Sequence, residues 1–151
     1  MEIYADYNRE YSSRGEGLRM RILAIDWGEK KIGLAIGEKL ANELSTIDSK
    51  NAVSEISKIV QSDGVEKIII GYPLRSQGEG GTHNRKIDDF INELQSLSPL
   101  APVEKIDEAF SSVEALRELQ NLGLKGKEAE KRVDQCAAKI ILDDYLNSLG
   151  S

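Results

Sequence analysis

Three acidic residues, Asp26, Glu108 and Asp134, stand at positions where a folded chain could bring their carboxylates together. Asp26 and Glu108 each close a short apolar run, whereas Asp134 lies within a long stretch of helical periodicity. Converging carboxylates repel one another, and a hard divalent cation with oxygen ligands relieves that repulsion. The three residues therefore predict a catalytic metal site for one or two Mg²⁺ or Mn²⁺ ions, which would activate water against a phosphodiester. In the alternative interpretation, the acidic residues merely terminate their elements.

The apolar residues around these positions predict a succession of strands and helices. Short apolar runs bounded by turn residues are typical of strands, and apolar residues spaced three and four apart are typical of helices. The predicted strands cover residues 21–26, 32–37, 43–48, 65–71 and 103–108. The predicted helices cover residues 51–62, 85–97 and 127–149, and one more begins at a cap formed by Ser111-Ser112 and ends before Asn121.

The order of these elements predicts an α/β fold with a mixed five-stranded sheet and helices on both faces. The three leading strands are joined by short turns and must be antiparallel, while the two later strands alternate with helices and run parallel. Ligands of such sheets bind at the carboxyl ends of the parallel strands. Asp26 and Glu108 end strands of this kind, and the small residues Ala137 and Ala138 would let the last helix bring Asp134 to the same edge.

A second group of candidate residues is basic and predicts contacts with a nucleic-acid backbone. A Gly-rich, cation-bearing loop follows the strand 65–71 and could hold phosphate oxygens on its amides and on the N-terminus of the next helix. The predicted nucleic-acid-binding residues are Lys30, Lys31, Arg75, Arg85, Lys86, Lys127 and Arg132. For the Gly-rich loop, the alternative is an ordinary surface loop. For Lys127 and Arg132, the alternative is a solvated face of a helix. Trp27 could stack on a base or pack against a neighbouring loop.

Composition and charge narrow the classes of protein that remain. The chain has 151 residues, 40% of them hydrophobic, and a net charge of −6, which argues against a nonspecific polyanion binder. The chain is too apolar for a disordered tail, and its apolar runs are too short to cross a bilayer. Residues 20–151 are predicted to form one domain, and residues 1–19 a disordered N-terminal extension or leader. The single cysteine, Cys136, is predicted to be a small core residue; it excludes a disulfide framework and favours a cytoplasmic location.

Four segments of the chain, taken in order, resemble the YqgF family, also called RuvX-like Holliday junction resolvases, within the RNase H-like superfamily. They are ILAIDWGEKKIGLAIGE, IIIGYPLRSQGEGGTHNRKIDDFINEL, DEAFSSVEAL and KGKEAEKRVDQCAAKIILDDYL. The resemblance covers nearly everything from Arg21 to about Leu146. It implies an RNase H-like fold and a metal-dependent nuclease, linked to maturation of the 5′ end of pre-16S ribosomal RNA and, by analogy, to branched DNA. It also implies that the acidic triad falls on Asp26, Glu108 and Asp134.

The chain departs from the family pattern at a position that bears on substrate binding. Where the family usually has Arg after the Asp-Glu pair, this chain has Ala109, which removes a bidentate partner for phosphate or carboxylate.

The expected sheet order also places the strand of Glu108 two strands from that of Asp26, about 9.5 Å away. Sheet twist and side-chain reach must then bring Glu108 to a shared metal.

The lead hypothesis is a Mg²⁺-dependent nuclease that hydrolyses phosphodiester bonds in structured RNA, pre-ribosomal RNA above all, or in branched DNA. Its predicted partners are these nucleic acids and no membrane, and the chain is predicted to be a monomer or a weak homodimer. A second hypothesis is a non-catalytic nucleic-acid-binding module with vestigial carboxylates. A nucleotide- or phosphate-binding module of the actin-like type ranks last, because such proteins duplicate this domain and 151 residues hold one copy.

Overall fold

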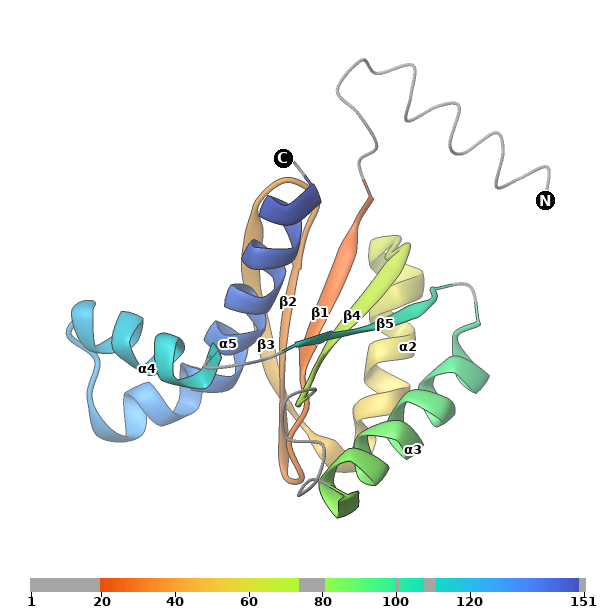
Figure 1. The fold of residues 1–151 in the computed structure, drawn as a ribbon, viewed down its shortest axis with the longest axis horizontal. Helices are drawn as coiled ribbons and strands as arrows, with labels where there is room; N and C mark the ends of the chain where they lie inside the picture. The colour runs from red at the N-terminus through yellow and green to blue at the C-terminus, as the bar shows by residue number, and fades with distance from the viewer. Residues whose placement is uncertain (1–19, 74–80, 100, 108–110, 150–151) are drawn as a thin grey trace.

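Five strands form one mixed sheet (Figure 1): β1 (Ile22–Asp26), β2 (Lys31–Gly37), β3 (Ala41–Asp48), β4 (Lys67–Tyr72) and β5 (Val103–Asp107). The computed structural model describes residues 20–73, 81–99, 101–107 and 111–149. The strand order is β3-β2-β1-β4-β5. The pairs β1–β2 and β2–β3 are antiparallel, and the pairs β1–β4 and β4–β5 are parallel. The mixed sheet predicted from the sequence is therefore confirmed.

Helices cover both faces of this sheet, as Figure 1 shows: α2 (Ala52–Asp63), α3 (Gly81–Leu97), α4 (Ser111–Asn121) and α5 (Gly126–Leu149). One face packs against α5, and the other packs against α2 and α3. The helix α4 packs on α5 and projects away from the sheet. None of the described helices is long and apolar enough to span a membrane.

The first strand is buried along its whole length because helices cover both of its sides. Its side chains alternate: Leu23 and Ile25 pack in the core shared with α2 and α3, whereas Ile22 and Ala24 pack against α5. A strand that is apolar on both faces is typical of the parallel part of an α/β sheet. The same alternation turns the side chain of Asp26, the last residue of β1, toward the α5 side.

A bulge in β3 changes which of its side chains face α5. The register with β2 shifts between Leu34 and Ala35, and Leu44 is the extra residue on β3. Glu43 and Thr46 consequently point to the same face, although they are three positions apart in the strand. Strict alternation along the predicted strand 43–48 would instead give Leu44 the place that Glu43 occupies.

Local interactions determine where the helix α2, which connects β3 to β4, begins and ends, close to the predicted range 51–62. The Asp48 carboxylate accepts a hydrogen bond from the Lys50 N–H at 2.9 Å, which caps the single 3₁₀ turn Ser49–Asn51 that leads into α2. At the other end, Gly64 has φ +66° and its N–H donates to the Val60 carbonyl. A left-handed residue at this position favours glycine, so α2 ends here and the chain turns into β4.

The interface between α4 and α5 contains the single cysteine. Cys136 is 2% exposed and packs among Ala115, Leu119 and Ala137, which confirms its predicted place in a core. Burial raises the pKa of its thiol to about 11, and the Glu43 and Glu118 carboxylates add to this effect. The thiol is therefore protonated at neutral pH and shielded from solvent.

We expect Cys136 in the native protein to resist thiol reagents. At pH 8 its reaction with Ellman's reagent should be roughly a hundredfold slower, or more, than in the chain unfolded by guanidinium, because only the thiolate reacts and its pKa returns to about 8.5 on unfolding. Stopped-flow absorbance with and without denaturant measures both rates. Similar rates in the two states would show that the α4–α5 interface opens readily.

Candidate active site

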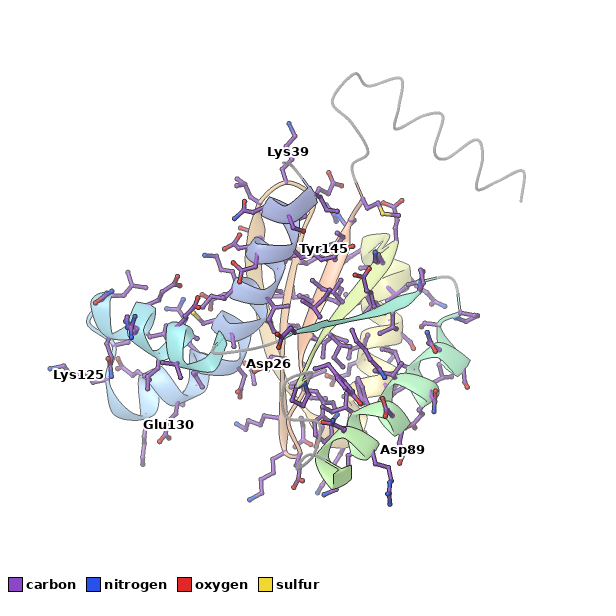
Figure 2. All side chains as sticks on the ribbon, in the orientation of Figure 1. Asp26, Lys39, Asp89, Lys125, Glu130 and Tyr145 are labelled. Carbon is purple, nitrogen blue, oxygen red and sulfur yellow. The ribbon has the colours of Figure 1, made fainter. Side chains whose placement is uncertain are left out.

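Asp26 lies on the α5 side of the sheet between two glycines. Its cross-strand partner on β2 is Gly33. On the other side, the parallel register that pairs Ile25 with Ile70 brings Gly71 of β4 next to Asp26. Asp26 is only 9% exposed, and Figure 2 shows it in the middle of the molecule, at the end of β1. The positions directly opposite this buried carboxylate on the two flanking strands thus carry no side chain.

The helix α5 comes very close to the sheet at Gly33. A Cβ atom at Gly33 would overlap the carbonyl oxygen of Asp134 and would lie 2.6 Å from the Gln135 nitrogen, so only glycine leaves room for the helix backbone. Gly33 is also the partner of Asp26, and the Cα atoms of such antiparallel pairs lie about 4.5–5.5 Å apart. The structure therefore places Asp26 and Asp134, two of the three predicted acidic residues, beside the same glycine.

The close approach of α5 also depends on the small residues predicted to allow it. Ala137 and Ala138 are both fully buried. The space beside Gly33 is filled by the α5 backbone at Asp134.

Burial raises the pKa of the Asp134 carboxyl above its usual value, and the positive charge of Lys31 offsets part of this rise. Lys31 begins β2 two residues before Gly33, so both belong to the series of β2 residues that faces α5. A carboxylate that has lost water gains more than an exposed one from a nearby cation, because the local dielectric constant is lower. The position of Asp134 thus favours cation binding.

Glu108, the third predicted carboxylate, lies outside the described residues. The strand that precedes it alternates clearly: Ile106 packs in the α5-side core, and Glu104 accepts a hydrogen bond from the Tyr145 hydroxyl of α5 at 3.2 Å. Lys105 points the other way and pairs with Asp88 of α3 at 2.8 Å. As predicted, β4 separates β5 from β1. Within the described ranges, no three acidic, histidine or cysteine side chains are grouped so that they could hold a metal ion.

The seven predicted nucleic-acid-binding residues differ in their surroundings. Five of them are exposed: Lys30, Lys31, Arg85, Lys86 and Lys127. Lys86 forms an ion pair with Glu29 at 2.7 Å, which ties α3 to the β1–β2 turn. Arg132 forms an ion pair with Glu43 at 3.0 Å. Arg75 lies outside the described residues.

The structure supports the packing interpretation of Trp27. Its ring centroid lies 6.5 Å from that of Phe90 on α3, with the two planes tilted by 56°. Trp27 also packs against the core on the α2 and α3 side. Because successive residues of a strand point to opposite faces, Trp27 and the Asp26 carboxylate lie on different sides of the sheet.

Three polar residues beside Asp134 were missed in the sequence: Glu43, Thr46 and Gln135. The Gln135 side chain donates to Glu43 at 3.0 Å and accepts from the Thr46 hydroxyl at 3.1 Å. Only the bulge in β3 brings both strand residues to the α5 side, and a bulge has no signal in this sequence.

The donors present at this site suit a hard divalent cation. Asp26 and Asp134 both offer carboxylate oxygens, which Mg²⁺ and Mn²⁺ prefer to sulfur or imidazole nitrogen. Asp26 is buried and Asp134 is desolvated enough to raise its pKa, so a cation between or beside them would relieve an electrostatic cost of folding. The glycines paired with Asp26 place no side chain directly opposite it on the flanking strands.

Comparison with protein families and curated proteins gives matches along nearly the whole described chain. A family model with the description "RuvX: Holliday junction resolvase" matches residues 20–148. A protein of Chloroflexus aurantiacus, named "Putative pre-16S rRNA nuclease", is 40% identical over 133 residues, which cover 84% of this chain and 86% of the relative. A protein of Phocaeicola vulgatus with the same name is 39% identical over 133 residues, covering 85% of this chain and 96% of the relative.

Comparison with solved structures identifies the fold. The chain is similar to Thermus thermophilus RuvC in complex with a Holliday junction substrate, with a TM-score of 0.56 at 14% identity. The superposition covers 87% of this chain and 97% of RuvC. A second structure of Thermus thermophilus RuvC gives a TM-score of 0.53 at 12% identity, over 87% of this chain and 96% of that one. The fold is therefore the RNase H-like fold of RuvC, as the sequence predicts.

We expect Gly33→Ala to displace α5 and to remove activity. The new methyl group would overlap helix backbone, which cannot rotate away, so the free energy of unfolding should fall by roughly 3 kcal/mol. Gly123→Ala is the matched control, because Gly123 has φ +87° and open space around it, so only backbone strain of about 1–2 kcal/mol applies. Urea unfolding measures both. Equal losses in the two variants would contradict the close contact at Asp134.

We expect Asp134→Asn to stabilise the metal-free protein at neutral pH. The folded-state pKa of Asp134 is raised, so ionisation costs stability as pH rises above the unfolded value near 3.8, and this cost is complete above the folded pKa. In EDTA, the melting temperature of Asp134→Asn should exceed that of the wild type by a few degrees at pH 7 and match it near pH 3. Asp48→Asn, at an exposed position at the same edge of the sheet, should change little. A variant that melts below the wild type at pH 7 would refute the electrostatic cost.

Proposed function

The chain belongs to the RuvX family, and from this premise we propose that it is a metal-dependent nuclease that acts on the 5′ end of pre-16S ribosomal RNA. The observation that carries the proposal is that Asp26 and the backbone of Asp134 adjoin the same residue, Gly33, at the carboxyl end of β1. The two residues belong to elements far apart in the sequence and lie at the edge of the sheet where ligands of α/β sheets bind. The names of the curated relatives supply the substrate.

In this proposal Asp26, Asp134 and Glu108 hold Mg²⁺ or Mn²⁺. Such an ion supplies Lewis-acid activation of water and of the scissile phosphate. Asp26, fixed on a central strand that is buried on both faces, keeps its carboxylate in one place while the helix supplies Asp134. Glu108 belongs to this proposal from the sequence alone, as the third acidic residue of the predicted triad.

Exposed cations beside the carboxylates would bind the RNA backbone. Lys31 supports this role best, since its charge already acts on Asp134. Lys30, Arg85 and Lys127 are exposed and free to approach phosphates, and Arg75 belongs to the same proposal from the sequence alone. Lys86 and Arg132 contribute less here, because each has a carboxylate partner.

The decisive variant is Asp26→Asn, which keeps the shape of the side chain and removes its charge. Cleavage of a pre-16S ribosomal RNA fragment in Mg²⁺ should fall by roughly a thousandfold or more, the loss expected when several kcal/mol of charge stabilisation disappear. The melting curve should show that the fold is intact. Asp48→Asn is again the control, and it should cleave at the wild-type rate.

The same assay separates the alternatives. A four-way DNA junction tested beside the RNA fragment decides between the two substrate classes. If the wild-type protein binds RNA with a steep salt dependence but cleaves nothing in Mg²⁺ or Mn²⁺, the non-catalytic binding module is the better description. If Asp26→Asn cleaves as fast as the wild type, the assigned site is wrong.

A further inference from the structure

We propose that Glu43 is a positioning residue that sets the rotation of α5 at Asp134, where the helix lies against Gly33, the cross-strand partner of Asp26. The inference rests on the proposed function, because Asp134 is taken as a metal ligand. Glu43 accepts hydrogen bonds from the Arg132 guanidinium at 3.0 and 3.2 Å and from the Gln135 amide at 3.0 Å. These two helix residues bracket Asp134, so one strand carboxylate holds the helix on both sides of it.

The contacts of Glu43 are those of a fixed side chain. Its side chain is 18% exposed, and both of its oxygens accept hydrogen bonds from Arg132. Thr46 adds a second link from the same strand, because its hydroxyl donates to the Gln135 carbonyl oxygen at 3.1 Å. Gln135 is thus bound through both ends of its amide. Hydrogen bonds to charged groups contribute more to stability than those between neutral groups, so this set of contacts resists rotation of the helix.

The bulge at Leu44 allows both Glu43 and Thr46 to contact α5. Without the extra residue, Glu43 and Thr46 would point to opposite faces of the sheet, and only one of them could reach α5. Bulges are common next to active sites, where they redirect a side chain. Here the bulge lets one edge strand place two polar side chains against the same turn of α5.

Rotation of α5 matters because Asp134 lies on a different side of the helix from its neighbours. Successive residues of a helix are turned by about 100°, so Arg132 and Gln135 share one side while Asp134 points away from them. Contact with Gly33 sets how near the helix backbone lies to the sheet. The contacts of Glu43, on the β3 side, add a second constraint on the rotation of the helix.

A residue that only stabilises the fold would give the same contacts, so the test needs a matched control. Glu104 provides one: it joins β5 to α5 through the Tyr145 hydroxyl and also pairs with Lys67. Tyr145 lies eleven residues after Asp134, and Figure 2 shows it well away from Asp26 along α5. Glu43→Ala and Glu104→Ala therefore each remove one strand carboxylate that contacts α5. Glu43 contacts the helix next to Asp134, and Glu104 contacts it far from Asp134.

Three measurements compare these two variants: melting temperature, kcat and KM on the RNA fragment, and Mn²⁺ affinity by calorimetry. Both variants should have a lower melting temperature than the wild type. Glu43→Ala should also lose kcat and Mn²⁺ affinity by roughly 10–100-fold, the effect typical of residues that orient metal ligands, with KM for RNA little changed. Glu104→Ala should retain both within about threefold.

The charge-exchanged variant Glu43→Arg with Arg132→Glu keeps the test decisive if Glu43→Ala does not fold. Each single exchange should lose kcat, and the double exchange should recover at least a tenth of it. A rise in KM with unchanged kcat in Arg132→Glu would show instead that Arg132 binds RNA, and it would overturn the proposal. Unchanged kcat and Mn²⁺ affinity in Glu43→Ala would do the same.

Hydrogen exchange distinguishes a failure of this inference from a failure of the proposed function. Glu43→Ala should speed amide exchange in residues 126–136 of α5, whereas Glu104→Ala should leave these amides as in the wild type. If this pattern is found but the wild type neither binds Mn²⁺ nor cleaves, Glu43 orders the helix and the proposed function is wrong. If Glu43→Ala leaves exchange in this segment unchanged, the positioning role of Glu43 is refuted whatever the wild type does.

Discussion

The contact between the α5 backbone and Gly33 is the constraint on which the rest of the site depends. No other residue at this position of β2 would let the Asp134 peptide lie against the sheet. Because Gly33 is the cross-strand partner of Asp26, this one contact sets how far apart the strand carboxylate and the helix carboxylate can be. Glycine on the neighbouring strand, at Gly71, keeps the other side of Asp26 equally free of side chains.

Most of the fold could be predicted from the sequence because local and global signals agree in it. The central strands β1 and β4 are apolar on both faces, and the helices repeat their apolar residues at the helical period. Short turns between the first three strands leave no choice but antiparallel pairing. Element ends were less well predicted: α3 begins at Gly81 rather than at 85, since the Gly-rich segment before it carries no apolar periodicity.

A site residue could be predicted only where its position within its own strand or helix indicated its role. Asp26 was found because it ends a strand, and Asp134 because small and apolar residues follow it at helical spacing. Glu43 was missed because its partners lie about ninety residues away and a bulge alone turns it toward them. For the same reason Arg132 was grouped with free cations, although a distant strand supplies its counter-charge.

The same burial that makes the carboxylates of this site costly to the folded protein favours the binding of a cation. In this chain of net charge −6, Asp26 is buried and Asp134 is partly desolvated. Water stabilises their charges poorly there, and both carboxylates repel an approaching phosphate. Burial raises the pKa of Asp134, and Lys31 offsets only part of this cost. The low dielectric constant that makes these carboxylates costly also strengthens their attraction for a divalent cation. A bound cation would cancel most of the local negative charge, so the same corner would repel the RNA backbone less with metal than without it.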